Sequence, residues 1–417
     1  MGKHGRILLA IFIIAFLFRL LIFGSAYHGD LNNNISWGRL VVERGFEGFY
    51  EGENWPYSAP NQPPLTILMF GLLAFLWEKV EAVFWFLNTK VGIFPSKIVW
   101  FWESRGMTFL FKLPSIIADL AIGWMIYQYM LHKKRRFGVY LTLLWLFNPV
   151  VWYNSTVWGQ TDSLVNFLGL ASTLSLIRKK LILSFMLFSL SLTFKGSLLI
   201  FVPILLFVAV RQKYRLSVWI KAAVGSLFAV FFFGSWFHPR PDITQWLFNL
   251  YKGRILPGEI GYLTANAFNL WWLVDPGKIP DSNLYLGLPA RVWGFVILLT
   301  GIILILVWLT RKVNDIRIFF SLIFLSFLSF LFMTRIHERY LYPFFPYATF
   351  FLASEPLFIF PYAVLSVTHL LNLYHLFWAP VGFLKPAFEN QQFPNLLAIV
   401  NIFVFVFICL RYLAKKS

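Results

Sequence analysis

The stretch that decides the fold class is IFFSLIFLSFLSFLFM at residues 318–333, followed by TRIHERY at 334–340 and LYPFFPYATFFLA at 341–353. A long apolar run without charge is typical of a helix surrounded by lipid or by other membrane helices. Ionisable side chains between two such runs are energetically expensive and usually have a function. The sequence therefore predicts a membrane protein with a polar site at the end of this run.

The composition extends this prediction to the whole chain. Of 417 residues, 59% are hydrophobic, 20% aromatic and 13% charged, whereas soluble domains carry about twice that charge. This composition excludes a disordered chain, a disulfide scaffold, a coiled coil and an ordinary cytosolic enzyme. The single cysteine, Cys409, permits no disulfide within the chain. The net charge of +18 is spread in short clusters between apolar stretches, which argues against nucleic-acid binding.

We predict an all-α polytopic membrane protein with about twelve transmembrane helices. The predicted crossings lie at 7–27, 107–131, 138–154, 162–177, 181–194, 197–210, 216–237, 289–310, 316–334, 340–353, 357–377 and 396–413. With both termini inside, the basic clusters face the cytoplasm, as the positive-inside rule requires. These clusters are Lys3 and Arg6, Lys133 to Arg136, Arg178 to Lys180, Arg211 with Lys213 and Arg215, Arg311 and Lys312, and Lys415 and Lys416. The first span could be a cleavable signal peptide, but Arg19 interrupts it and favours a retained anchor.

Segment 64–103 is apolar but also charged, and it either crosses the membrane twice or lies at the interface. A single crossing would move every later basic cluster outside. We expect one domain, 1–417, with two outer loops, 28–63 and 238–288, that hold short interfacial helices. In the second loop, interface anchoring is the favoured role of the polar and aromatic residues Asn266, Asn269, Trp271 and Trp272.

This topology places four polar motifs on one outer face. They are His28-Gly29-Asp30, Trp158-Gly159-Gln160-Thr161-Asp162, Phe194-Lys195-Gly196, and Arg335 with His337-Glu338-Arg339-Tyr340. Asp30 follows the first span at the membrane–water boundary, where a carboxylate suits a general base that deprotonates a sugar hydroxyl. A helix cap before Leu31 is an equal alternative for Asp30.

The motif at 337–340 is predicted to bind a phosphate. Arg339 can offer a bidentate fork, His337 can donate to the phosphate oxygens, and Glu338 can hold either of them or balance their charge. Arg335 supplies a second basic group beside the motif. The alternative is a snorkelling arginine with an internal Glu–Arg pair. No second histidine follows at helical spacing, so no zinc signature is present and no metal site is expected.

Lys195 lies at an outer turn, where its ammonium could attract an anionic lipid headgroup, although a snorkelling lysine is at least as compatible with the sequence. In the other motif, Gln160 and Asp162 can hydrogen-bond sugar hydroxyls, and Trp158 can stack on a sugar ring. An aromatic belt with a helix cap at Asp162 is an equal alternative.

Taken in order, these motifs resemble the GT-C superfamily of polyprenyl-phosphate-sugar-dependent glycosyltransferases. The resemblance rests on Gly29-Asp30, the Pro-Pro-Leu-Thr run at 63–66, the Lys-Leu-Pro-Ser stretch at 112–115, Asp162, the Phe-Lys-Gly turn at 194–196 and His-Glu-Arg-Tyr at 337–340. It is nearest to the branch that contains the glucosyltransferases of N-glycan assembly and prokaryotic relatives with His-Glu-Arg-Tyr.

This resemblance implies a GT-C fold and an inverting hexosyltransferase with no cofactor. Asp30 would be the catalytic base, and His337, Glu338, Arg339 and Lys195 would bind the donor phosphate. The implied partners are a polyprenyl-phosphate donor of mannose or glucose, a glycan or glycolipid acceptor, and membrane lipid. Separately, the compact length and the absence of a retention signal lead us to expect a bacterial or archaeal plasma membrane, with the site outside. The alternatives are a lipid-linked sugar flippase and an oligosaccharide ligase or polymerase.

Overall fold

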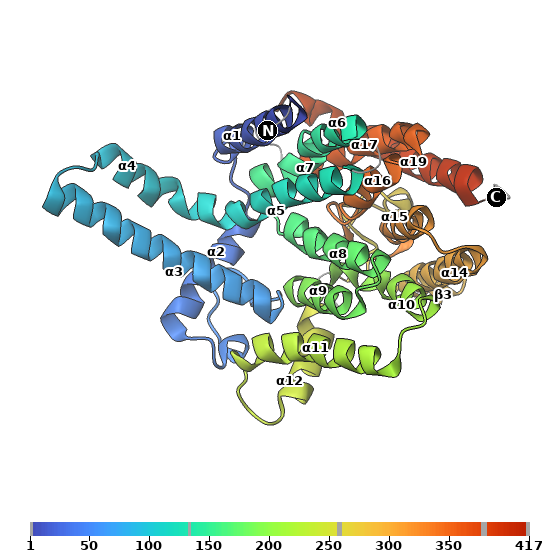
Figure 1. Ribbon diagram of the computed structural model, residues 1–417, viewed down its shortest axis with the longest axis horizontal. Helices are drawn as coiled ribbons and strands as arrows, with labels where there is room; N and C mark the ends of the chain where they lie inside the picture. Colours follow the sequence, from blue (N-terminus) through green and yellow to red (C-terminus); the bar gives the residue numbers. More distant parts are fainter. Residues whose placement is uncertain (1–2, 132–134, 257–260, 377–381, 414–417) are drawn as a thin grey trace.

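The computed structural model of the chain is a bundle of helices, most of which run along the long axis of the view in Figure 1. The residues that it describes are 3–131, 135–256, 261–376 and 382–413. Four lysines of the predicted basic clusters lie outside these residues, namely Lys133, Lys134, Lys415 and Lys416.

The first half of the chain forms α1 (Lys3–Ile22), α2 (Asp30–Arg44), α3 (Pro64–Phe86), α4 (Ser96–Phe101), α5 (Met107–Met130), α6 (Arg135–Leu146), α7 (Pro149–Trp152), α8 (Asp162–Ile177), α9 (Leu181–Phe194) and α10 (Val202–Arg211). Short helical turns between them are η1 (Phe49–Glu51), η2 (Leu87–Val91), η3 (Trp102–Gly106), η4 (Tyr153–Trp158) and η5 (Gly196–Phe201).

The second half forms α11 (Leu216–Ser235), α12 (Ile243–Leu250), α13 (Leu270–Val274), α14 (Ala290–Arg311), α15 (Asp315–Phe332), α16 (Phe344–Leu352), α17 (Ile359–Leu376), α18 (Lys385–Glu389) and α19 (Gln392–Ile408). Its short turns are η6 (Tyr251–Ile255), η7 (Pro356–Phe358), η8 (Gly382–Leu384) and η9 (Cys409–Leu413). The strands are β1 (Thr264–Ala265), β2 (Leu284–Tyr285), β3 (Leu288–Pro289) and β4 (Ile336–His337).

The structure confirms an all-α polytopic membrane protein but does not confirm twelve crossings. Among the described residues, seven helices are long and apolar enough to span a bilayer. They are Gly5–Ile22, Ser96–Met130, Leu216–Ser235, Ala290–Arg311, Asp315–Phe332, Pro356–Leu376 and Gln392–Leu413. The other predicted crossings fall on shorter helices. For example, α16 has 9 residues, and at about 1.5 Å per residue it is shorter than the roughly 30 Å hydrocarbon layer.

The predicted crossing at 138–154 is broken into separate elements. Helix α6 ends at Leu146, and α7 begins at Pro149. Asn148 caps α7 because its side chain accepts a hydrogen bond from the Val150 amide, and Pro149 occupies the first helical position, where no amide hydrogen is needed. This break lets the next turn, η4, carry Trp158 toward the first outer loop.

Segment 64–103 forms most of a helical arm that projects from the bundle in Figure 1. Helix α3 leads outward, Gly92 turns the chain at φ +72°, and α4 returns into α5. The two sides are held by Trp77 and Trp102, each of whose indole N–H groups donates to the other's backbone carbonyl, at 3.3 and 3.2 Å. The arm thus runs outward along α3 and back along α4 and η3 into α5.

The core has two main parts. The larger apolar cluster lies among the helices of the bundle, and α15 is buried along most of its length. A second cluster joins α2, α3 and the start of α5, and it includes Trp37, Phe70 and Phe111. The second cluster fixes the first outer loop against the bundle, and this contact positions Asp30.

Candidate functional site

Asp30 is held by two side chains from the turn between α7 and α8. Its Oδ2 accepts hydrogen bonds from Trp158 Nε1 at 3.1 Å and from Gln160 Nε2 at 2.6 Å. The turn reverses at Gly159, whose φ of +87° favours glycine, and an added Cβ would lie 3.1 Å from Leu31 Cδ2. Thus η4 ends at Trp158, and the turn at Gly159 lets the side chains of Trp158 and Gln160 both contact Asp30 in the first outer loop.

The cap role of Asp30 is wrong. Although α2 begins at Asp30, its cap residue is Gly29, and no side chain caps the helix. The carboxylate turns to Trp158 and Gln160 and remains 40% exposed. His28 lies beside it, with Nδ1 accepting from the Asp30 amide at 3.0 Å. The His28 ring also packs on Trp158 at a centroid distance of 4.6 Å.

Trp158 and Gln160 organise the site and do not offer free surfaces to a sugar. Trp158 is completely buried, so no face of its ring is open in this structure for the predicted stacking on a sugar ring. Gln160 is 8% exposed, and its amide is already bonded to Asp30.

The Lys-Leu-Pro-Ser stretch at the start of α5 ties these segments together. Lys112 Nζ donates to the carbonyls of Phe23 at 2.7 Å, Ala26 at 3.2 Å and Val157 at 2.8 Å. Ser115 donates to the Gln160 carbonyl at 2.7 Å. These bonds link the exit of α1, which leads to Asp30, to the turn that carries Trp158 and Gln160.

Asp162 and Lys195 form a nearly buried ion pair. Lys195 Nζ donates to Asp162 Oδ1 at 2.7 Å, and the two side chains are only 11% and 5% exposed. Asp162 begins α8 without capping it, because its carboxylate is directed to Lys195. Thus the ammonium predicted to attract a lipid headgroup is already neutralised within the protein.

The motif at 337–340 is positioned by the second outer loop. Strand β1 pairs in parallel with β4, and Ala265 is the register partner of His337. In this loop Trp271 and Trp272 are 4% exposed, and Asn269 caps α13. The predicted interface anchors are therefore part of the folded interior that supports His337.

Arg335 points away from the site, contrary to its predicted place in the phosphate group. Its guanidinium forms two bonds to Asp281, with Nε–Oδ2 at 2.6 Å and Nη2–Oδ1 at 3.1 Å. The backbone of Arg335 has a φ of +62°, and this turn separates its side chain from that of Arg339.

Glu338 and Arg339 form a second ion pair, with Nη1–Oε1 at 2.7 Å. Burial opposes ionisation of Glu338, but Arg339 and His337 lower its pKa to about 2. Burial also opposes the charge on Arg339, but Glu338 and, more weakly, Asp30 and Asp162 raise its pKa. Burial and Arg339 together lower the pKa of His337. Both groups of the pair are therefore charged, whereas His337 is neutral at pH 7.

The four motifs meet in one electrostatic cluster. The negative charges of Asp30 and Asp162, which lie on different helices, both raise the pKa of Arg339. The pKa of His28 is lowered by burial, raised by Asp30 and lowered by Arg339, with a net decrease. Lys195 and Arg339 both lie near the Tyr340 ring, each 5.7 Å from its centroid. The structure thus brings together Asp30, Asp162, Lys195 and the motif at 337–340.

A buried network beneath the cluster was missed at the sequence level. Asp119 on α5 pairs with Arg19 on α1 at 3.2 Å, and both side chains are completely buried. Asp119 also accepts from Ser155 and Ser163, both at 2.6 Å. A lone acid within a predicted span, opposite a basic residue in another span, was the available signal. Ser163 follows Asp162 directly, so this network anchors the start of α8.

Within the part of the chain that the structure describes, no group of three His, Cys, Asp or Glu side chains could hold a metal ion. Three carboxylates and two cations are present in the cluster, and two of the carboxylates are already paired with cations.

One family model matches this chain, and it covers residues 49–273, which is more than half of the chain. Its description is "GPI transamidase subunit PIG-U". No curated protein matches the chain. The matched segment contains Trp158, Gln160, Asp162 and Lys195 but neither Asp30 nor the motif at 337–340.

This match corrects the expected function. The prediction of an inverting hexosyltransferase is wrong, because the family is a subunit of a transamidase complex. The expected partners, a polyprenyl-phosphate sugar donor and a glycan or glycolipid acceptor for it, are wrong for the same reason. The nearest branch named from the motifs is not confirmed, although the matched family is related to GT-C-like glycosyltransferases. The chain belongs to the PIG-U family of multi-pass membrane proteins.

Proposed function

We propose that this chain is a membrane subunit of a GPI-transamidase-type complex and that its outer cluster binds the headgroup of the glycolipid anchor. A transamidation exchanges the amine of one amide for another amine, so an anchor attached in this way must present an amine. In this proposal, the chain holds that headgroup, and a partner subunit makes the new amide bond.

The observation that carries the proposal is the charge balance of the cluster. Asp162 is paired with Lys195, and Glu338 is paired with Arg339. Among the described residues, no lysine or arginine pairs with Asp30, and its neighbour His28 has a lowered pKa and is neutral at pH 7. Asp30 is also the most exposed of the three carboxylates, at 40% against 5% and 0%. An ammonium group is the complement of such a carboxylate.

Arg339 would bind the phosphate of the same headgroup. Arg339 Nε is buried and has no hydrogen-bond partner, and the Arg339 side chain is 15% exposed. The charge of Asp30 raises the pKa of Arg339, which supports a position of the Arg339 guanidinium near the Asp30 carboxylate. A zwitterionic headgroup, with its ammonium on Asp30 and its phosphate toward Arg339, therefore suits the cluster better than a phosphate alone.

We place the chain in the endoplasmic-reticulum membrane, which is the setting of this family, and not in a bacterial or archaeal plasma membrane. The outer cluster would face the lumen. Protein subunits of the complex would be its main partners.

The test compares two glycolipids on the purified complex, one with a phosphoethanolamine group and one with the same amine acetylated. Acetylation should weaken binding to the wild type about tenfold or more, because a charged hydrogen bond contributes about 1.5–3 kcal/mol. In the Asp30→Asn variant the two lipids should bind alike, as expected when one variant has already removed the interaction. Binding can be measured by photo-crosslinking.

Asp242→Asn is the matched control, because Asp242 is an exposed acid that pairs with His238 and takes part in none of the bonds to Asp30. It should bind both lipids as the wild type does, and all variants should retain the other subunits on purification. Equal binding of both lipids to the wild type would contradict the ammonium contact with Asp30. Loss of subunits from Asp30→Asn would instead assign Asp30 to assembly.

A further inference from the structure

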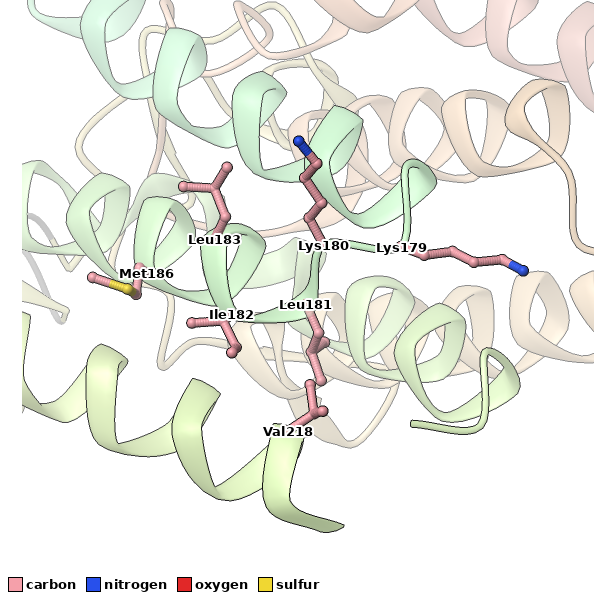
Figure 2. A pocket seen from close by; sticks show the side chains of 7 residues that line it. All are labelled: Lys179, Lys180, Leu181, Ile182, Leu183, Met186 and Val218. Carbon is pink, nitrogen blue, oxygen red and sulfur yellow. The ribbon is translucent and has the colours of Figure 1, made fainter. Parts of the chain in front are cut away.

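We propose that a single anionic phospholipid binds in a lysine-rimmed hollow between the starts of α9 and α11. Its phosphate would lie at Lys179 and Lys180, and its acyl chain would lie on the apolar wall. The hollow has a volume of about 400 Å³ and is lined by Lys179, Lys180, Leu181, Ile182, Leu183, Met186 and Val218 (Figure 2). This inference concerns a different site from the outer cluster around Asp30 and does not depend on it.

The hollow lies at the other end of the bundle from the outer cluster. Helix α8 begins at Asp162 in that cluster and ends at Ile177, just before Lys179. Its 16 residues cover about 24 Å at about 1.5 Å per residue. The hollow therefore faces the opposite leaflet, at the rim where the basic clusters gather.

The charges around the hollow are of one sign. No acidic residue occurs in the sequence between Asp162 and Asp242. Lys179 and Lys180 are exposed, and neither forms an ion pair with any described residue. Figure 2 shows the two lysine side chains leaving the rim with their amino ends extended. Such a rim is complementary to an anionic headgroup.

A second basic turn lies directly beside the first. Gln212 Nε2 donates to the Leu176 carbonyl at 2.9 Å and so joins the turn at 211–215 to the end of α8. This second turn carries Arg211, Lys213 and Arg215. The two turns, joined by this bond, together carry six exposed basic residues, Arg178, Lys179, Lys180, Arg211, Lys213 and Arg215. This arrangement is more concentrated than one row of basic residues flanking a span.

The wall of the hollow is apolar, which selects a lipid over a free phosphate. Ile182, Leu183 and Met186 lie on one side in Figure 2, and Val218 of α11 lies below Leu181. Leu183 is 46% exposed, so a chain that lies on this wall would cover apolar surface. A volume of about 400 Å³ accommodates the upper part of one phospholipid, with the remainder of its chains in the bilayer.

Mass spectrometry of the full chain, released from detergent under non-denaturing conditions, tests the inference. The chain would be equilibrated with phosphatidylinositol, phosphatidic acid or phosphatidylcholine. One anionic lipid should remain bound, and phosphatidylcholine should not. Lys179→Gln with Lys180→Gln should weaken this binding about thirty-fold, which corresponds to about 1 kcal/mol for each lysine near an anionic lipid.

The matched control is Arg311→Gln with Lys312→Gln, which removes the same charge from the exposed C-terminal end of α14. It should leave the bound lipid in place. Met186→Gln, in the apolar wall, should also weaken binding although it removes no charge. Equal loss in the Arg311/Lys312 control would show attraction by net charge and overturn the site. Competition by inorganic phosphate or by soluble inositol phosphate at lipid concentrations would show a phosphate site without an acyl-chain contact and would also overturn it.

Discussion

At the scale of single residues, the partner of each charge decides its role. Lys195 and Arg339 were both predicted to bind phosphate, and both turn out to be paired with buried carboxylates. Asp30, predicted as a base or a cap, instead accepts two side-chain N–H groups and keeps its negative charge exposed. The same residues thus support recognition of a zwitterion better than that of an anion.

The buried pair of Arg19 and Asp119 gives a prediction at this scale. Arg19→Met leaves the Asp119 charge buried without its cation, so unfolding free energy should fall by about 3–5 kcal/mol. Adding Asp119→Asn should restore most of the loss, because the amide can still bond Ser155 and Ser163. Chemical unfolding in detergent micelles would measure both effects.

Arg6→Met serves as the control for Arg19→Met, because Arg6 is an exposed arginine on the same helix, and its loss should change stability by less than about 0.5 kcal/mol. If the double variant were as unstable as Arg19→Met alone, the charge imbalance would not be the cause.

At the scale of elements, the first outer loop depends on close packing of α2 against α3. Gly38 lies at their contact, and a Cβ there would meet the Phe70 carbonyl oxygen at 2.6 Å and Phe111 Cζ at 2.9 Å. Since a backbone carbonyl cannot move aside as a flexible side chain can, no larger residue fits without a shift of one helix. The apolar cluster around Trp37 and Phe70 depends on this approach.

Gly38→Ala should therefore lower stability by about 1–3 kcal/mol through overpacking. Amide hydrogen exchange in α2 should rise more than in α15, because the strain is local to the first outer loop. Gly253→Ala is the matched control, because nothing lies within 4 Å of an added Cβ there. Unchanged exchange in α2 of Gly38→Ala would show that the helices separate without cost.

At the scale of the whole molecule, the outer cluster and the lysine-rimmed hollow should lie on opposite sides of the membrane. We predict that cysteines introduced at exposed Glu53 and exposed Arg211, in a Cys409→Ser background, react from opposite sides of sealed vesicles. An impermeant maleimide should label only one of them until detergent is added. Labelling of both before detergent would contradict the arrangement of α8 across the bilayer.

The sequence by itself determined the class of the molecule and the meeting of its motifs. Low charge and long apolar runs leave lipid as the only solvent for much of the chain, and the basic clusters order its two sides. The twelve predicted crossings placed the motifs around Asp30, Asp162, Lys195 and Arg339 on one face, and the structure brings these motifs together although it does not confirm that number of crossings. The same motifs led to the resemblance to GT-C enzymes. The matched family is related to these enzymes, which explains why the motifs are shared. The activity did not follow, because one fold can carry different functions.

Only the tertiary structure decided which charges neutralise one another. Hydropathy reports how apolar a segment is, but ion pairs depend on distances of a few ångströms between side chains from different helices. Thus Arg335 could not be separated from Arg339 until Asp281 was seen to bind it. The shortness of α16 and the break at Asn148 likewise depend on neighbouring helices that shelter them from lipid. Asp30 retains its exposed charge for the same reason: the cations near it have nearer carboxylates.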